Sequence, residues 1–260
     1  MSFDPDQAAA LLHAVRRQRG QVAPLPPDLT PQTETDGAAV QHALARRVGA
    51  APPGGFKIGA TARRMQEYLG VTEPAAGFMA VADLLPSGAA LRFADFVRPG
   101  VECELAVRLA CDLPPAPCTL DQAAQAVGEL FAGIEIVENR YGEFATLGMP
   151  TLIGDQFFHA AAVLGEPHAQ DWHALDVAAL RGQIVVDGDM RDEGVGADLL
   201  GHPLNCLAWL ANSSVAAAFG GLKAGQVVML GSVTPPIWLT GPASVKVEFA
   251  PLPPVRLRLD

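Results

Sequence analysis

Three glutamates carry the strongest chemical signal in this sequence. Glu102 and Glu104 lie two residues apart in an alternating apolar run, and Glu135 stands between Ile134 and Ile136 further along the chain. Residues two apart in a strand point to the same face, and a carboxylate among aliphatic side chains is costly unless a positive group meets it. Carboxylate oxygens without a nearby Cys or His suit Mg²⁺ or Mn²⁺ better than zinc. We therefore predict a divalent-metal site formed by the three glutamates.

Two simpler explanations of these glutamates stay open at this stage. A Glu-x-Glu pair in an alternating strand is typical of the solvent face of an antiparallel sheet. Glu135 could instead form an ion pair with an arginine, and Arg108 and Arg140 are available. The residues alone do not choose between a metal site and these structural explanations.

The composition indicates a compact protein with an acidic surface. The chain has 260 residues, 50% of them hydrophobic and 18% charged, which argues against disorder. Its formal net charge of −10 disfavours binding to nucleic acid or to anionic membranes. The apolar stretches are too short or too interrupted to span a bilayer, and the N-terminus lacks the order of a signal peptide, so we expect a cytoplasmic protein. The 4 cysteines show no zinc-binding spacing.

Proline and glycine residues divide the chain into a helical N-terminal part and a β-rich remainder. We predict an N-terminal helical segment (1–50) packed on a catalytic domain (51–260), with Asp4 as the first N-cap and Pro5 in the first turn. Predicted helices are 4–19, 34–48, 61–69, 120–131 and 203–219; predicted strands are 55–60, 89–92, 101–109, 133–138, 158–164, 182–187, 226–231 and 244–249. Many strands with few helices between them indicate an α+β fold with a mixed, largely antiparallel sheet.

Several motifs, in order over nearly the whole chain, resemble the 2-oxopent-4-enoate (2-keto-4-pentenoate) hydratases of the fumarylacetoacetate hydrolase superfamily. The motifs are Gly55-Phe56-Lys57-Ile58-Gly59-Ala60-Thr61, Leu69-Gly70-Val71 with Glu73-Pro74, Arg98-Pro99-Gly100-Val101-Glu102-Cys103-Glu104, Ile134-Glu135-Ile136-Val137-Glu138-Asn139-Arg140, Gly201-His202-Pro203-Leu204 and Gly231-Ser232. The resemblance implies a rolled mixed β-sheet that encloses the site and follows N-terminal helices. It also implies that Glu102, Glu104 and Glu135 bind Mg²⁺ or Mn²⁺.

The resemblance further implies roles for single residues around the metal. Lys57 would meet an oxo or carboxylate oxygen of the substrate, although a solvated lysine on a strand face is the ordinary alternative. Asp83 matches an acidic position that lines the site in similar proteins, although its spacing alone is typical of a turn. His202 and Ser232 are expected near the substrate, with capping of a helix or of a turn as the alternatives.

Three differences from the family patterns concern the pocket and the reaction. Hydratases often carry Asp-Asn-Ala-Ser where this chain has Asp155-Gln156-Phe157-Phe158, so Phe158 is expected to narrow or dry the substrate pocket. An unusual Pro235-Pro236-Ile237-Trp238 precedes Thr240-Gly241-Pro242-Ala243, where a Pro-Gly-Asp turn is typical. The hydrolase branch has a His–Glu pair just before its metal-binding acids, whereas Phe96-Val97-Arg98-Pro99 stands here, which disfavours hydrolysis of a carbon–carbon bond.

The resemblance thus implies a divalent-metal-dependent hydratase. It would add water to a small-molecule 2-hydroxy-2,4-dienoate, giving a 4-hydroxy-2-oxo acid in a meta-cleavage pathway of aromatic catabolism. A 2-oxo-3-enedioate (4-oxalocrotonate-type) decarboxylase with the same metal ligands is the nearest alternative, and a non-catalytic partner subunit of such an enzyme is another. The resemblance also implies a homo-oligomer and association with a related decarboxylase.

Overall fold

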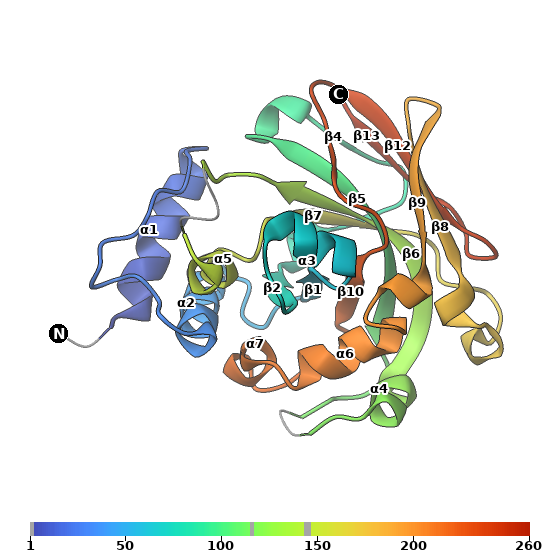
Figure 1. The fold of residues 1–260 in the computed structure, drawn as a ribbon, viewed down its shortest axis with the longest axis horizontal. Coiled ribbons are helices and arrows are strands. Elements are labelled where there is room, and N and C mark those ends of the chain that lie inside the picture. Colours follow the sequence, from blue (N-terminus) through green and yellow to red (C-terminus); the bar gives the residue numbers. More distant parts are fainter. Residues whose placement is uncertain (1–2, 115–116, 143–146) are drawn as a thin grey trace.

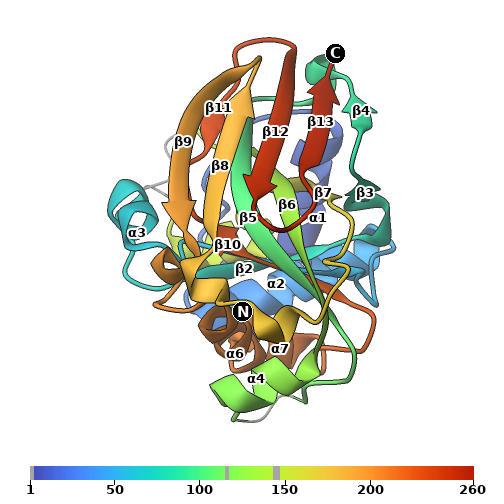
Figure 2. The same cartoon turned by 90° about the vertical axis from the view of Figure 1, so that its right-hand side faces the viewer.

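Two β-sheets form the body of the protein, and helices lie along one side of it (Figures 1 and 2). The computed structural model describes residues 3–114, 117–142 and 147–260. The strands are β1 (Gly55–Gly59), β2 (Ala75–Met79), β3 (Leu84–Pro86), β4 (Ala89–Leu91), β5 (Pro99–Leu109), β6 (Val127–Glu138), β7 (His159–Leu164), β8 (Arg181–Val186), β9 (Asp189–Val195), β10 (Val227–Ser232), β11 (Ile237–Trp238), β12 (Ala243–Phe249) and β13 (Val255–Leu259). The helices are α1 (Pro5–Arg17), α2 (Glu34–Arg47), α3 (Arg63–Leu69), α4 (Leu120–Ala126), α5 (Met149–Gly154), α6 (Pro203–Ala211) and α7 (Ser214–Ala218).

The larger sheet is mixed and the smaller one packs against it. Within the described residues the larger sheet has 8 strands in the order β2-β1-β10-β5-β6-β7-β3, with β11 paired to β5, and the smaller has 5 in the order β4-β13-β12-β8-β9. Strand β1 runs parallel to β10, and β3 parallel to β7, whereas β5 is antiparallel to both β6 and β10. Strands β12 and β13 contact β6, so the core lies between the two sheets. The predicted α+β fold with a rolled mixed sheet is confirmed.

Strands β5 and β6 form the centre of the larger sheet. They have 11 and 12 residues, pair in antiparallel register and are buried along most of their length. A strand buried on both faces usually consists of apolar residues almost throughout. The glutamates within β5 and β6 are therefore exceptions to the expected composition. In Figure 2 both strands pass through the middle of the molecule, behind the strands of the smaller sheet.

The N-terminal helices form as the sequence predicts. The Asp4 carboxylate accepts hydrogen bonds from the first-turn amides of α1, and Thr33 caps α2 in a capping box. Helix α2 packs on α1, α5 and α7. The division of the chain at residue 50 stays a prediction. Among the described residues no helix has the length and apolar character that crossing a bilayer requires.

Two of the predicted helices end differently in the structure. The predicted helix 203–219 is two helices, α6 and α7, because Ser213 caps α7 and interrupts the first run. The predicted helix 120–131 ends at Ala126, where β6 begins. Strands β2, β3, β9, β11 and β13 and helix α5 lie outside the predicted elements. Strand β9 was missed because its exposed sequence, Asp189–Val195, is polar and is typical of a loop.

A buried ionic network joins α1 to the sheet. The Asp155 carboxylate accepts from Arg16 Nε at 2.6 Å, from Arg140 Nη2 at 3.1 Å and from the Tyr141 hydroxyl at 2.8 Å. Burial alone would raise the pKa of Asp155, but the two guanidinium groups outweigh it and the pKa lies below its ordinary value. Asp155 is therefore ionised at neutral pH and stabilises the junction of α1 with the segment that follows α5.

We expect Asp155→Asn to lower the free energy of unfolding by about 3 kcal/mol, because it leaves Arg16 without its carboxylate partner and Arg140 with Glu138 alone. The surface substitution Asp95→Asn, which removes the exposed partner of Arg19 and Arg92, should have a much smaller effect, because solvent screens these ion pairs. Urea unfolding at pH 7 measures both. The stabilisation by Asp155 is present above its unfolded-state pKa of 3.8 and is lost as the pH falls through the folded-state value. Equal losses for the two variants would contradict this account.

Candidate metal centre and active site

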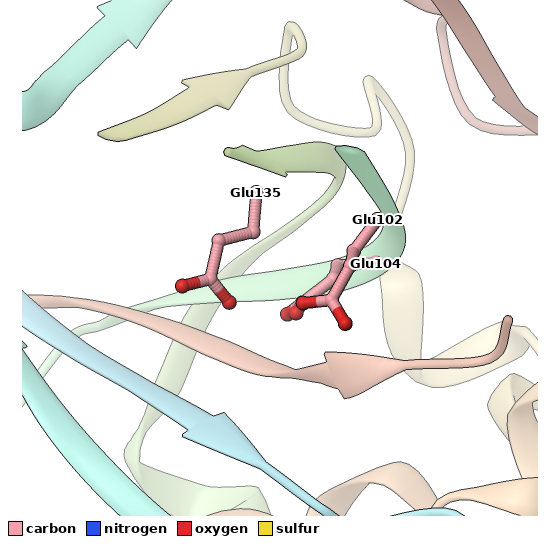
Figure 3. Close-up of side chains that lie close together, drawn as sticks. All are labelled: Glu102, Glu104 and Glu135. Atoms are coloured by element: carbon pink, nitrogen blue, oxygen red, sulfur yellow. The ribbon is translucent and has the colours of Figure 1, made fainter. Parts of the chain in front are cut away.

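Three carboxylates converge at the middle of the larger sheet (Figure 3). Glu102 lies directly opposite Glu135 in the register of β5 and β6, and Glu104 follows on the same face as Glu102. One carboxylate oxygen from each lies within 4.8 Å of the other two. The three residues are 7%, 1% and 0% exposed. The glutamates therefore do not form a solvent face, and that alternative is wrong.

The charges of this cluster are poorly compensated. Burial, followed by the proximity of Glu135, raises the pKa of Glu102 to about 8 and raises the pKa of Glu104 well above its ordinary value. Burial would also raise the pKa of Glu135, but Lys57 and His159 outweigh it and lower that pKa. Among the described residues, Glu104 Oε1 and Glu135 Oε2 are buried without a hydrogen-bond partner. A cluster of three carboxylates with one lysine beside it and with unused oxygens is suited to a cation.

The donor set fits a hard divalent cation. Oxygen ligands lie about 2.0–2.6 Å from Mg²⁺ or Ca²⁺, so ligands across such an ion are about 4–5 Å apart. The three glutamates meet this spacing, and the remaining oxygen of Glu104 is held by the amide of Gly231 at 3.0 Å. Glu102, Glu104 and Glu135 could therefore hold one such ion between them.

Lys57 and His159 both contact one oxygen of Glu135. Lys57 Nζ lies 3.2 Å and His159 Nδ1 2.9 Å from Glu135 Oε1, which leaves Oε2 as the unpartnered atom. Lys57 is 1% exposed, so the solvated-lysine alternative is wrong. The proposed arginine partners of Glu135 are also wrong: Arg108 pairs with Glu129, and Arg140 with Glu138 and Asp155.

Sequence reasoning missed His159. The segment before the acids contains no histidine, but β7 lies beside β6 and brings His159 to Glu135 from the other side. The sequence predicts a strand over 158–164, but the residues of this segment do not indicate that the strand pairs with β6. Asp83 lies in the short 3₁₀-helix Val81–Asp83, where its Oδ2 accepts from the Ala80 amide and lies 3.9 Å from His159 Nε2. Asp83 thus reaches the carboxylates only through His159.

The side chains of His202 and Ser232 form hydrogen bonds with backbone groups. His202 is the N-cap of α6, and its Nδ1 accepts from the Leu204 amide. The Ser232 hydroxyl donates to the Thr234 carbonyl at 2.6 Å and accepts from the Cys103 amide at 3.2 Å. These contacts match the capping alternatives that the sequence left open for both residues.

A narrow cleft leads from the carboxylates toward the surface. It encloses about 30 Å³ and is lined by Lys57, Gly59, Ala60, Met65, Tyr68, Leu69, Glu102, Val137, Phe157, Phe158, Pro236 and Trp238. Phe158 is one of these lining residues, and its narrowing of a substrate pocket stays a prediction. A larger cavity of about 430 Å³ lies on the other side of His159 and is bordered by Asp83 and Arg16.

An unusual backbone turn shapes the cleft. Gln156, Phe157 and Phe158 have φ angles of 60°, 45° and 68°, in the left-handed region that non-glycine residues rarely adopt. The turn brings the Phe157 ring to 5.2 Å from Lys57 Nζ. A Cβ at Gly59 would lie 2.4 Å from this ring, so only glycine allows the contact. Strain at such positions is typical of functional sites.

Replacing His159 with Gln should weaken the binding of a divalent cation about 10- to 100-fold, which is typical when a hydrogen bond to a metal-binding carboxylate is lost. The reason is that the Glu135 carboxylate would lose the hydrogen bond at Oε1 that holds it in place beside the other two carboxylates. Isothermal titration with Mg²⁺ or Mn²⁺ measures the change. His173→Gln, at an exposed histidine paired with Asp171, is the matched control and should leave the affinity unchanged. An unaltered affinity in the His159 variant would remove His159 from the metal centre.

The stability of the metal-free protein should fall as the pH rises from 4.5 toward about 8. A carboxyl group whose folded-state pKa is raised binds more protons in the folded protein than in the unfolded chain across this window, so its ionisation destabilises the fold. Thermal unfolding in a chelator at several pH values tests this expectation. Added Mg²⁺ should remove most of the decline, because the cation replaces the protons. A metal-free protein that gains stability from pH 6 to pH 8 would contradict the assignment.

The fold is a β-roll with three buried, converging carboxylates at its centre. Comparison with known proteins identifies the family to which it belongs. Residues 49–259 match the model of the fumarylacetoacetate (FAA) hydrolase C-terminal family. The chain therefore belongs to the fumarylacetoacetate hydrolase family.

Individual relatives carry out related reactions. The chain is 33% identical over 184 residues to a 2-hydroxyhexa-2,4-dienoate hydratase of Comamonas testosteroni, covering 70% of this chain and 68% of the relative. It is 30% identical over 237 residues to a 2-oxo-hept-4-ene-1,7-dioate hydratase of Escherichia coli, covering 88% of each. The 4-oxalocrotonate decarboxylase of Pseudomonas putida G7, solved with magnesium and adipate, has the same fold, with a TM-score of 0.88, 23% identity and coverage of 98% and 97%.

Proposed function

We propose that this protein is a divalent-cation-dependent hydratase that adds water to a 2-hydroxy-2,4-dienoate and gives a 4-hydroxy-2-oxo acid. The observation that carries the proposal is the buried, converging trio Glu102, Glu104 and Glu135, in which Glu104 and Glu135 each keep one oxygen without a partner and Lys57 lies beside Glu135. The relatives with the higher identities are hydratases of such acids, which supports hydration as the reaction. Assembly into a homo-oligomer, association with a related decarboxylase and a cytoplasmic location stay predictions.

The three glutamates would hold Mg²⁺ or Mn²⁺. When bound, the ion supplies Lewis-acid stabilisation of negative charge on the 2-oxygen and carboxylate of the substrate. Glu135 is held for this role by Lys57 and His159, which occupy its other oxygen. The apolar residues of the cleft exclude bulk water, which strengthens each electrostatic contact inside it.

Lys57 is the cation that can stabilise negative charge at the reacting end of the substrate. Its ammonium lies at the inner end of the cleft and can donate a hydrogen bond to the 2-oxygen as that oxygen becomes an enolate. The dienol gains a proton at C5 and loses the proton of its 2-hydroxyl, which gives a 2-oxo-3-enoate. Water then adds its oxygen to C4 and a proton to C3. The balance is one water consumed and one 4-hydroxy-2-oxo acid formed.

Decarboxylation is the second candidate, because relatives at 26% and 25% identity are 4-oxalocrotonate decarboxylases. The purified chain is incubated with Mg²⁺ and either 2-hydroxypenta-2,4-dienoate or 2-oxohex-3-enedioate in ¹⁸O-labelled water. Hydration predicts a 4-hydroxy-2-oxo acid with the label at C4 and no CO₂ above background. Release of CO₂ from the enedioate without labelled product would favour the decarboxylase. Rapid turnover by the isolated chain would also exclude a purely non-catalytic partner subunit.

A further inference from the structure

The cleft beside the carboxylates has two chemically different ends. Its inner end carries Lys57 and Glu102, which belong to the metal centre. Its outer end is formed by Met65, Tyr68 and Leu69 from α3, together with Pro236 and Trp238 before and within β11. A substrate that occupies this cleft with its carboxylate and 2-oxygen at the inner end directs its tail toward this outer group.

The outer end offers no counter-charge to an acidic tail. Among the described lining residues, Lys57 is the sole cation, and it is already 3.2 Å from Glu135. The guanidinium of Arg98 lies 6.0 Å from the Trp238 ring centroid, but Arg98 is not among the residues that line the cleft. Moving a carboxylate from water into such surroundings without a partner is strongly unfavourable. An uncharged tail instead gains from burial against Met65 and Trp238.

Tyr68 and Trp238 join across the outer end. Trp238 Nε1 donates to the Tyr68 hydroxyl at 3.3 Å, which connects α3 to β11. Helix α3 has a single buried residue, Met65, and begins without a side-chain cap, so it is a weakly anchored wall of the cleft. A cleft of about 30 Å³ is smaller than any dienoate, and this wall is the one that can yield to admit a short tail.

We propose that the cleft selects dienoates with a short uncharged hydrocarbon tail, and that Tyr68 and Trp238 form the wall that the tail contacts. This inference rests on the proposed function, because it places the substrate head at the metal centre. It distinguishes this chain from a relative such as the 2-oxo-hept-4-ene-1,7-dioate hydratase, whose name specifies a dicarboxylate.

The first test compares the substrates 2-hydroxyhexa-2,4-dienoate and 2-hydroxyhepta-2,4-diene-1,7-dioate with the wild-type chain and Mg²⁺. We expect kcat/KM to be about 100-fold or more higher for the methyl-tailed acid, in the range that a pocket contact provides. Equal values, or a preference for the dicarboxylate, would overturn the inference while leaving hydration intact.

The second test moves a positive charge to the outer end. Tyr68 is 53% exposed, so Tyr68→Arg should fold, and we expect it to raise kcat/KM for the dicarboxylate about tenfold and lower it for the methyl-tailed acid. Met190→Arg, at a residue 57% exposed on β9, adds the same charge elsewhere and is the matched control. If the two variants have the same kcat/KM for the dicarboxylate, Tyr68 does not contact the tail.

A binding measurement separates failure of this inference from failure of the proposed function. Calorimetry with Mg²⁺ and the unreactive acids 2-oxohexanoate and 2-oxoadipate reports the tail preference even if neither dienoate is turned over. Tighter binding of 2-oxohexanoate by about tenfold or more supports the inference. Equal or tighter binding of 2-oxoadipate refutes it. Absence of turnover alone would refute only hydration.

Discussion

Replacing Glu102 with Gln should lower metal-dependent turnover about 1,000-fold or more, because the Lewis-acid contribution of a bound cation is several kcal/mol. The variant should also bind Mg²⁺ much more weakly, since one of the three converging carboxylates is lost. Its metal-free stability at pH 8 should equal or exceed that of the wild type, because a buried acid with a pKa raised to about 8 is removed. Steady-state kinetics, calorimetry and thermal unfolding measure the three effects on one preparation.

Glu129→Gln is the matched control for this substitution. Glu129 lies on β6 as Glu135 does, but it is partly exposed and pairs with Arg108. The control should keep wild-type turnover and cation affinity. A Glu102→Gln variant that stays fully active, or one that is inactive only because it is unfolded, would contradict the assignment of Glu102 to the metal centre.

Lys57→Met should lower kcat about 100- to 10,000-fold, the range typical of a lost proton donor or oxyanion contact. The affinity for Mg²⁺ should change by less than about tenfold, because losing the Lys57 contact with Glu135 Oε1 also removes a positive charge that repels the cation. The separation of the two effects distinguishes an acid in the reaction from a residue that merely holds a ligand in place.

Lys246→Met provides the comparison. Lys246 lies on β12 and pairs with Glu248 near the surface, so its loss should leave kcat unchanged. If Lys57→Met instead loses cation binding and turnover together, Lys57 acts only through Glu135. A wild-type rate in Lys57→Met would remove Lys57 from the mechanism.

The sequence was sufficient to single out the three glutamates as unusual because that part of the signal is local. Glu102 and Glu104 share a face through the strand period of two, and aliphatic neighbours mark their burial. The direct pairing of Glu102 with Glu135 was not predictable, since it depends on the register of two strands far apart in the sequence. The helix caps at Asp4 and Thr33 depend on neighbouring residues alone and formed at or within a residue of the predicted starts.

Other parts of the site depend on contacts between distant segments. His159 reaches Glu135 only because β7 pairs with β6, and Trp238 reaches Tyr68 only because β11 adds to β5 beside α3. The left-handed turn that places Phe157 against Lys57 contains no glycine, so the sequence has no signal that predicts it. Conversely, His202 and Ser232 satisfy backbone groups, which a motif match cannot reveal.

The most direct test of a metal-dependent site at Glu102, Glu104 and Glu135 is the ultraviolet absorbance of 2-hydroxypenta-2,4-dienoate after the protein is added. With Mg²⁺ present, the band should disappear; after treatment with a chelator it should persist, and renewed Mg²⁺ should restore its loss. Disappearance of the band at the same rate in the chelator-treated protein would contradict the central claim.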